Sequence, residues 1–143
     1  FNLSRLDRGS VDVVVSQAAF EHFADVESTI TQLTDVVKSG GALVAEIDLM
    51  THTGVLRGRD PLNIYRFPRW LYRLARFRGI PNRVRPQDYQ RFLTRNGWID
   101  VKIIPLQTLS QEALDRTRSG LARAYRDDAG MGILTFLLMA SKR

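Results

Sequence analysis

Three side chains in the N-terminal part of the sequence could carry acid–base chemistry: Glu21, His22 and His52. Imidazole is the side chain whose unperturbed pKa lies nearest neutrality, so a histidine can accept and return a proton under ordinary conditions. His52 lies between Thr51 and Thr53 and competes with the Glu21-His22 dipeptide for this role. We therefore predict a catalytic group among Glu21, His22 and His52. The alternative for His52 is a solvated loop residue.

These side chains follow two apolar runs that have the pattern of parallel strands. A β-branched run, Val11–Ser16, is followed by a mostly helical segment, 18–38, and then by the apolar run Ala42–Met50. A strand, a helix and a second strand in succession predict a parallel pair with a right-handed crossover. We expect helices on both faces of the first strand, and a helix end at Lys38–Gly41. Ligands of open α/β sheets bind outside the carboxyl ends of the strands, so the loop around His52 is well placed.

The rest of the chain predicts helices and two more strands. Pro86 suits the first position of a helix that Asn96-Gly97 ends. An amphipathic helix is predicted over 66–77, with an apolar side formed by Trp70, Leu71, Leu74 and Phe77. A later helix is expected to start from a capping box at 108–111 and to carry Leu114, Leu121 and Tyr125, and strands are predicted over 99–106 and 132–141.

The order of these motifs resembles the class I S-adenosylmethionine-dependent methyltransferases. In that family an acidic-apolar strand, a Glu-His dipeptide and a basic-x-Gly-Gly turn recur at the spacing of Val11–Ser16, Glu21-His22 and Lys38–Gly41. The phrase Arg85–Tyr89 resembles the segment before the sixth strand of many small-molecule members. The resemblance covers nearly all of the chain. It implies an α/β fold: the C-terminal half of a Rossmann-like sheet, strands four to seven, with the last strand antiparallel between the fifth and sixth, and a helical insertion.

The resemblance also implies a cofactor and a reaction. S-adenosylmethionine would donate its methyl group by direct displacement to a small-molecule or other acceptor, and the protein would align the reactants. Ser16, Gln17 and Ala18 match the strand end that contacts the cofactor in the family. In many members the Glu-His dipeptide is architectural instead, with the histidine packed against strands and the glutamate paired or capping.

The sequence lacks one hallmark of the family. The glycine-rich cofactor loop and a ribose-binding acidic residue lie on the first two strands of the family, and no G-x-G-x-G occurs here. We therefore expect residues 1–143 to be a partial methyltransferase domain, a fragment of a longer enzyme that is inactive by itself. We also expect a predominantly parallel sheet. Without the first strand of the family, one edge of Val11–Ser16 would be open, which predicts a homo-oligomer through that edge.

Positive charge is concentrated in one region. The net charge of the chain is +6, and the segment 57–95 alone holds eleven arginines and only two acids. We interpret this region as a basic helical insertion on the acceptor side, where an anionic acceptor would be held. The candidate substrate-binding residues are Tyr65, Arg66, Trp70 and Arg73. The alternatives are a module that binds nucleic acid or anionic lipid, and a non-catalytic assembly subunit.

Composition adds three expectations. With 44% hydrophobic and 25% charged residues, the 143-residue chain is ordinary for one globular domain. The absence of cysteine and of an apolar run long enough to cross a bilayer favours a cytoplasmic protein without a transmembrane segment. Two histidines thirty residues apart, without a carboxylate cluster at ligand spacing, predict no metal site.

Overall fold

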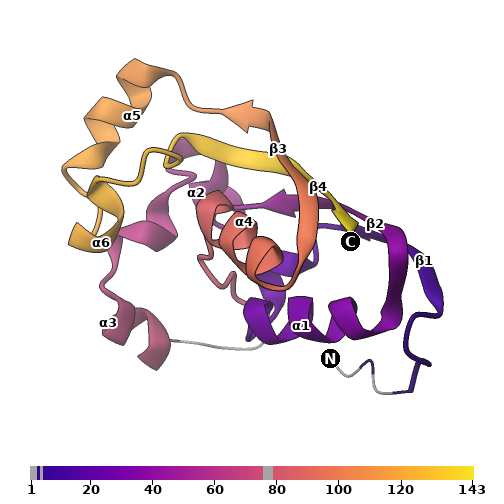
Figure 1. Ribbon diagram of the computed structural model, residues 1–143. Coiled ribbons are helices and arrows are strands. Elements are labelled where there is room, and N and C mark those ends of the chain that lie inside the picture. The colour runs from indigo at the N-terminus through magenta and orange to yellow at the C-terminus, as the bar shows by residue number, and fades with distance from the viewer. Residues whose placement is uncertain (1–2, 4, 76–78) are drawn as a thin grey trace.

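The computed structural model describes residues 3, 5–75 and 79–143, and it builds one sheet with helices around it (Figure 1). Short 3-10 turns, η1 and η2, follow the first strand and the second helix. The elements in chain order are β1 (Val11–Gln17), η1 (Phe20–His22), α1 (Val26–Val36), β2 (Val37–Asp48), α2 (Gly54–Arg59), η2 (Asn63–Arg66), α3 (Arg69–Leu74), α4 (Pro86–Arg95), β3 (Trp98–Thr108), α5 (Gln111–Arg118), α6 (Arg123–Arg126) and β4 (Ile133–Lys142).

The four strands are ordered β1-β2-β4-β3. β1 and β2 run parallel, and the chain crosses between them through α1. β4 lies antiparallel between β2 and β3. The predicted parallel pair and the antiparallel insertion of the last strand are thus confirmed. The expectation of a predominantly parallel sheet is wrong, because β4 makes two of the three strand pairings antiparallel.

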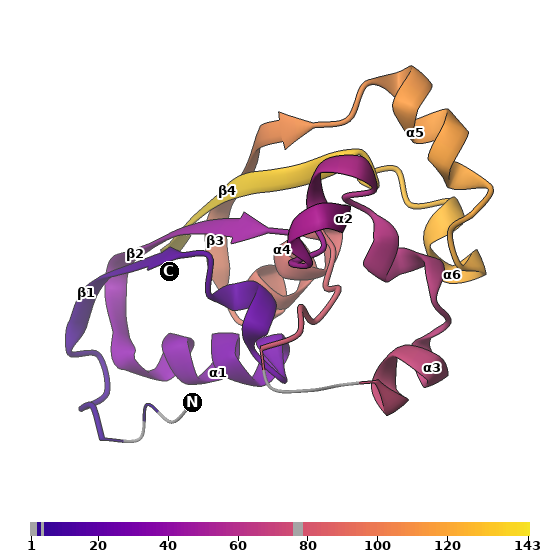
Figure 2. The ribbon, with the colours of Figure 1, turned by 180° about the vertical axis from the view of Figure 1, so that it is seen from behind.

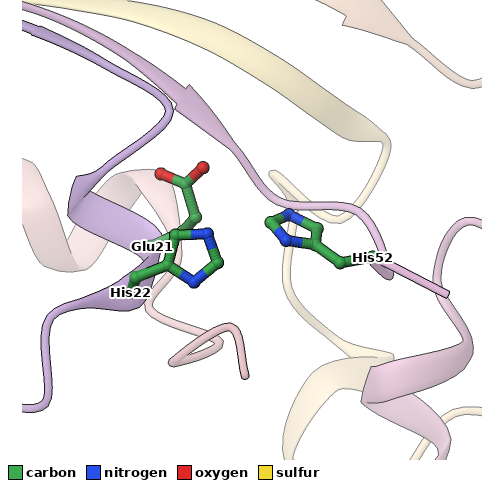
Figure 3. Close-up of side chains that lie close together, drawn as sticks. All are labelled: Glu21, His22 and His52. Atoms are coloured by element: carbon green, nitrogen blue, oxygen red, sulfur yellow. The ribbon is translucent and has the colours of Figure 1, made fainter. Parts of the chain in front are cut away.

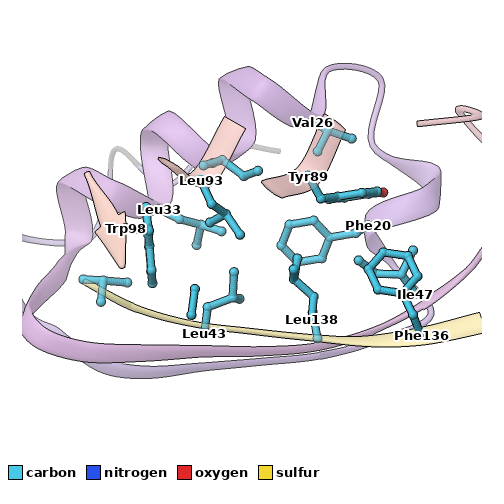
Figure 4. Close-up of a cluster of buried hydrophobic side chains, with 14 of the residues drawn as sticks. Phe20, Val26, Leu33, Leu43, Ile47, Tyr89, Leu93, Trp98, Phe136 and Leu138 are labelled. Carbon is cyan, nitrogen blue, oxygen red and sulfur yellow. The ribbon is translucent and has the colours of Figure 1, made fainter. Parts of the chain in front are cut away.

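Helices cover one face of this sheet. α1 and α4 lie on the same side of the strands in both views (Figures 1 and 2). Alternate residues of β2 and β4 point toward them, and Leu43, Ile47 and Leu138 are fully buried against Leu93 (Figure 4). The sequence predicted helices on both faces of the first strand, which is wrong. The side chains of Val13 and Val15 are 55% and 77% exposed because no described helix covers that face.

The junction between α1 and β2 differs from the prediction. The helix begins at Val26, because the Asp25 side chain caps it by accepting a hydrogen bond from the Ser28 amide at 2.9 Å. It ends at Val36, and the expected helix terminus, Lys38–Gly41, instead opens β2. Gly41 permits this close approach, because a Cβ there would lie 2.6 Å from Val37 Cγ1 and 2.9 Å from the Asp12 carbonyl oxygen.

The helix predicted over 66–77 is shorter in the structure. α3 is helical only over Arg69–Leu74, and Phe77 lies outside the described residues. Trp70 and Leu74 are 65% and 77% exposed, so the predicted apolar side lies largely in solvent. The amphipathic pattern was real, but nothing in the described part of the chain packs against it fully.

The C-terminal elements mostly match the sequence. α4 starts at Pro86 and strand β3 includes Pro105 on the sheet edge, as predicted. The later helix differs in two ways: Ser110, not Thr108, caps it, and it divides into α5 and α6.

A second core forms beyond the carboxyl ends of β1 and β2, where α5 and α6 lie (Figure 2). Its buried members include Tyr65, Leu121 and Tyr125. Arg85, only 4% exposed, ties this core to the sheet by donating to Asp128 Oδ2 at 3.0 Å, the Tyr65 hydroxyl at 3.0 Å and the Gly130 carbonyl at 2.7 Å. In the described part of the chain, no helix is both long and apolar enough to cross a membrane.

Candidate functional site

The candidate site lies at the carboxyl ends of the strands, where β1 and β2 end side by side. The two strands are parallel, and Gln17 is in register with Glu46. The Ala18 amide donates to the Glu46 carbonyl at 3.0 Å, and Gln17 Nε2 lies 3.4 Å from Glu46 Oε2. Because both strands run the same way, the segments that follow them emerge at the same edge.

The predicted cofactor-facing residues occupy the end of β1. Ser16 and Gln17 are its last two residues, and the Gln17 side chain is exposed. Ala18 has a φ of 47°, a left-handed conformation that a residue with a Cβ rarely adopts. This turn ends the strand abruptly and sends the chain into η1, which carries Glu21 and His22.

The three predicted catalytic side chains come together. Glu21 and His22 lie on η1, whereas His52 lies in the loop after β2. The His22 and His52 rings pack edge to face with centroids 4.8 Å apart, and one ligand atom from each of the three side chains lies within 4.8 Å of the others (Figure 3). The parallel sheet therefore places side by side two histidines that are thirty residues apart in the sequence.

Glu21 is buried, and the backbone amides of Glu21 and Asp48 act on its carboxylate without forming a well-aligned hydrogen bond. The residue is 1% exposed, and neither carboxylate oxygen has a hydrogen-bond partner among the described residues. Burial raises the pKa of the Glu21 carboxyl to about 7; the backbone amides of Glu21 and Asp48 oppose the rise, and the charges of Asp48 and Glu46 add to it.

His52 lies beside a second carboxylate. Its Nε2 is 3.7 Å from Asp48 Oδ2, and Asp48 also pairs with Arg57 at 2.6 Å. Burial lowers the pKa of His52; Asp48 raises it, and His22 and Arg57 lower it further. The imidazole is therefore held in its neutral form, which can accept a proton or bind a metal ion.

A largely apolar cavity of about 480 Å³ adjoins His52. Thr51, His52 and Thr53 form one side of it, and Ile64, Phe67 and Leu71 contribute apolar surface. Sequence reasoning identified the His52 loop but missed Ile64 and the residues near Pro81, because they lie in irregular segments without a periodic pattern.

A second cavity, of about 340 Å³, lies between α3 and α4 and has arginines in its lining. Arg73 lines it together with Arg69, Arg83 and Arg91. Arg83 is fixed by hydrogen bonds to the carbonyls of Ile64 and Phe67, at 3.1 and 2.8 Å, and stacks 3.9 Å over the Tyr72 ring.

The other predicted substrate-binding residues lie elsewhere. Tyr65 is fully buried in the second core, where its hydroxyl donates to the Leu49 carbonyl. Arg66 pairs with Asp60 at 2.6 Å, and Trp70 lines neither cavity. Aromatic residues at helical spacing do not by themselves distinguish core from cavity, which is why the sequence grouped these three with Arg73.

Comparisons with known proteins agree on the fold. The family model for a methyltransferase domain matches residues 2–45. No curated protein matches the chain. A phosphoethanolamine N-methyltransferase 2 from Haemonchus contortus, solved with S-adenosyl-L-methionine, is similar to the chain with a TM-score of 0.57 and 14% identity, covering 96% of this chain and 34% of its own.

Two prokaryotic structures are similar to the same degree. A SAM-dependent methyltransferase from Archaeoglobus fulgidus has a TM-score of 0.58 and 15% identity, covering 98% of this chain and 63% of its own. Another from Thermotoga maritima has a TM-score of 0.54 and 14% identity, covering 99% and 60%. The chain thus spans from about one third to somewhat under two thirds of these structures. It carries the fold of the class I S-adenosylmethionine-dependent methyltransferases, with methyltransferase-domain sequence over residues 2–45.

Proposed function

We propose that the protein to which these residues belong transfers a methyl group from S-adenosylmethionine to a small-molecule acceptor. The observation that carries the proposal is the shared end of β1 and β2 within the class I fold: Gln17 ends β1 in register with Glu46, and Glu21 lies near His52, which lines a cavity. A similar structure contains S-adenosyl-L-methionine. Another contains phosphomonomethylethanolamine and S-adenosylhomocysteine.

The strand end offers groups that suit part of the cofactor. Ser16 and Gln17 supply a hydroxyl and an exposed amide, and the left-handed turn at Ala18 leaves little side chain in the way. We assign these three residues to cofactor contact. When bound, S-adenosylmethionine supplies a labile methyl on a positive sulfur, and the remaining task of the protein is alignment.

We assign Glu21, His22 and His52 to the acceptor side of the site. Their position at the same edge as Gln17, and the opening of the cavity beside His52, support a role in receiving the acceptor proton or orienting the acceptor. The largely apolar cavity walls favour an acceptor with an apolar or aromatic body. Arg73, with Arg69 in the second cavity, is the proposed contact for an acceptor that carries an anionic group.

Five of the eleven arginines of the segment 57–95 favour this reading over the nucleic-acid alternative. Arg57, Arg66 and Arg91 pair with acids at 2.6 Å. Arg83 and Arg85 are buried in hydrogen-bond networks of their own. Charges that are bound internally in this way are less available to a phosphate backbone.

Backbone NMR tests the cofactor assignment even if binding is weak. We expect S-adenosylhomocysteine, added to millimolar concentration, to shift the amide signals of Ser16, Gln17 and Ala18 more than those of α5. Gln17→Ala should reduce the shifts, whereas Gln111→Ala, a change of the same type on α5, should not. Shifts absent from the end of β1, or confined to other elements, would refute the assignment.

A further inference from the structure

Glu21, His22 and His52 form a donor set that general metal chemistry recognises. Each side chain offers one ligand atom, and these atoms lie within 4.8 Å of one another. Two imidazoles and one carboxylate are the protein ligands of many catalytic zinc sites, which keep a further position open. The sequence alone predicted no metal site, because the histidines are far apart until the parallel strands bring their loops together.

The buried carboxylate is the independent observation that points to a cation. Glu21 is 1% exposed, and both its oxygens lack a hydrogen-bond partner among the described residues. A buried polar group without a partner is costly, and a charged one much more so. A cation bound between Glu21 and the two imidazoles would satisfy this carboxylate.

The surroundings of the cluster suit a bound cation. Asp48 lies beside the His52 ring, with 3.7 Å between Oδ2 and Nε2, and a carboxylate next to a ligating histidine commonly fixes the orientation of its ring. The charges of Asp48 and Glu46 act on Glu21, and the cationic group of Arg57 opposes them through its pair with Asp48. The acidic groups near the cluster thus outnumber the basic one.

We propose that Glu21, His22 and His52 bind one divalent transition-metal ion of the zinc type. Imidazole ligands favour zinc, cobalt and nickel, whereas magnesium and calcium prefer oxygen-only sites. Both histidines reach solvent, and His52 also lines the apolar cavity, so an open coordination position would face bulk water or a ligand in that cavity. Metal binding does not depend on the proposed methyl transfer and is measured separately from it.

The test is a titration of untagged protein, since a polyhistidine tag would itself bind the metal. Cobalt(II) absorption, with zinc(II) as the competitor, should report one ion per chain with a dissociation constant on the order of micromolar. Glu21→Gln, His22→Ala and His52→Ala should each weaken binding by about tenfold or more. Glu112→Gln, an exposed carboxylate change on α5, should leave it unaltered, and magnesium should not compete.

A second readout needs no variant. His22 and His52 are the only histidines of the sequence, so their ring-proton NMR signals can be followed directly. Zinc should shift both sets of signals together, saturating at one equivalent. No shift at millimolar zinc, a shift of only one histidine, or cobalt binding that survives His52→Ala in a protein with unaltered circular dichroism would overturn the proposal. In each of these cases the response of Ser16–Ala18 to S-adenosylhomocysteine remains a separate result.

Discussion

At the scale of single residues, the chemistry of the site was readable but its geometry was not. The sequence named Glu21, His22 and His52 because few side chains can exchange protons near neutrality. It could not show that all three converge, since the contact between the His22 and His52 rings depends on the register of β1 with β2. Nor could it show that the Glu21 carboxylate is buried without a well-aligned hydrogen bond, because a Glu-His dipeptide can also occur on an exposed turn.

The burial of Glu21 predicts how stability depends on pH. Its carboxyl has a pKa of about 7 in the folded chain against an ordinary value of 4.5, so the folded state binds the proton more tightly. The stability that this protonation contributes is complete below pH 4.5 and is lost as pH rises through 7. Glutamine cannot ionise. The free energy of unfolding of Glu21→Gln, relative to that of the wild type, should therefore increase by roughly 2–3 kcal/mol between pH 5 and pH 8.

Urea unfolding in the presence of a chelator, at several pH values, measures this difference. The exposed Glu112→Gln should show no such trend, because its carboxylate remains in solvent in both states. A pH-independent difference between Glu21→Gln and wild type would mean that Glu21 is ionised and satisfied in the folded protein.

At the scale of elements, periodicity predicted where helices and strands form but not what they pack against. α1, α4 and β3 follow their sequence signals closely, with Asp25 and Pro86 at the helix starts. The glycines at 40 and 41 were interpreted as a helix end. They instead lie in β2, where the backbone at Gly41 passes too close to Val37 and Asp12 for a side chain. Periodicity predicted an apolar side for α3, but it could not show that Trp70 and Leu74 on that side are exposed.

A pair of leucine substitutions tests this description of the helices. Leu93 of α4 is fully buried, whereas Leu74 of α3 is 77% exposed. Leu93→Ala should lower the free energy of unfolding by about 2–5 kcal/mol, because it leaves a cavity in the core. Leu74→Ala should change it by about 0.5 kcal/mol or less, as expected of a surface position. Comparable losses for the two variants in urea unfolding would show that α3 packs against a core after all.

At the scale of the whole molecule, the sheet has a strand edge that is unusually open. β1 pairs with β2 on one side, and it stands at the end of the four-stranded order of the described chain. On the sheet face beside this edge, Val13 and Val15 are 55% and 77% exposed. An unprotected, valine-rich edge strand is a template for pairing with another chain.

We therefore expect the 143-residue chain to self-associate through β1. Val15→Lys should shift it toward the monomer, because a lysine on an edge strand disfavours pairing with a second chain. Val55→Lys, a similarly exposed valine at 71% on α2, should not. Light scattering coupled to size-exclusion chromatography measures the mass of each variant over a range of concentrations. A wild-type chain that remains monomeric at high concentration would contradict the expectation.

The central claim is that the carboxyl ends of β1 and β2 form the cofactor and acceptor side of a methyltransferase site. Ultraviolet cross-linking of methyl-labelled S-adenosylmethionine, followed by tryptic peptide mapping, tests it most directly. The account predicts label in the tryptic peptides 9–38 and 39–57, which hold Ser16–Ala18 and His52. An excess of unlabelled S-adenosylhomocysteine should prevent the labelling. Label that resists this competition, or that falls mainly on peptides of α5, α6 or β4, would contradict the account.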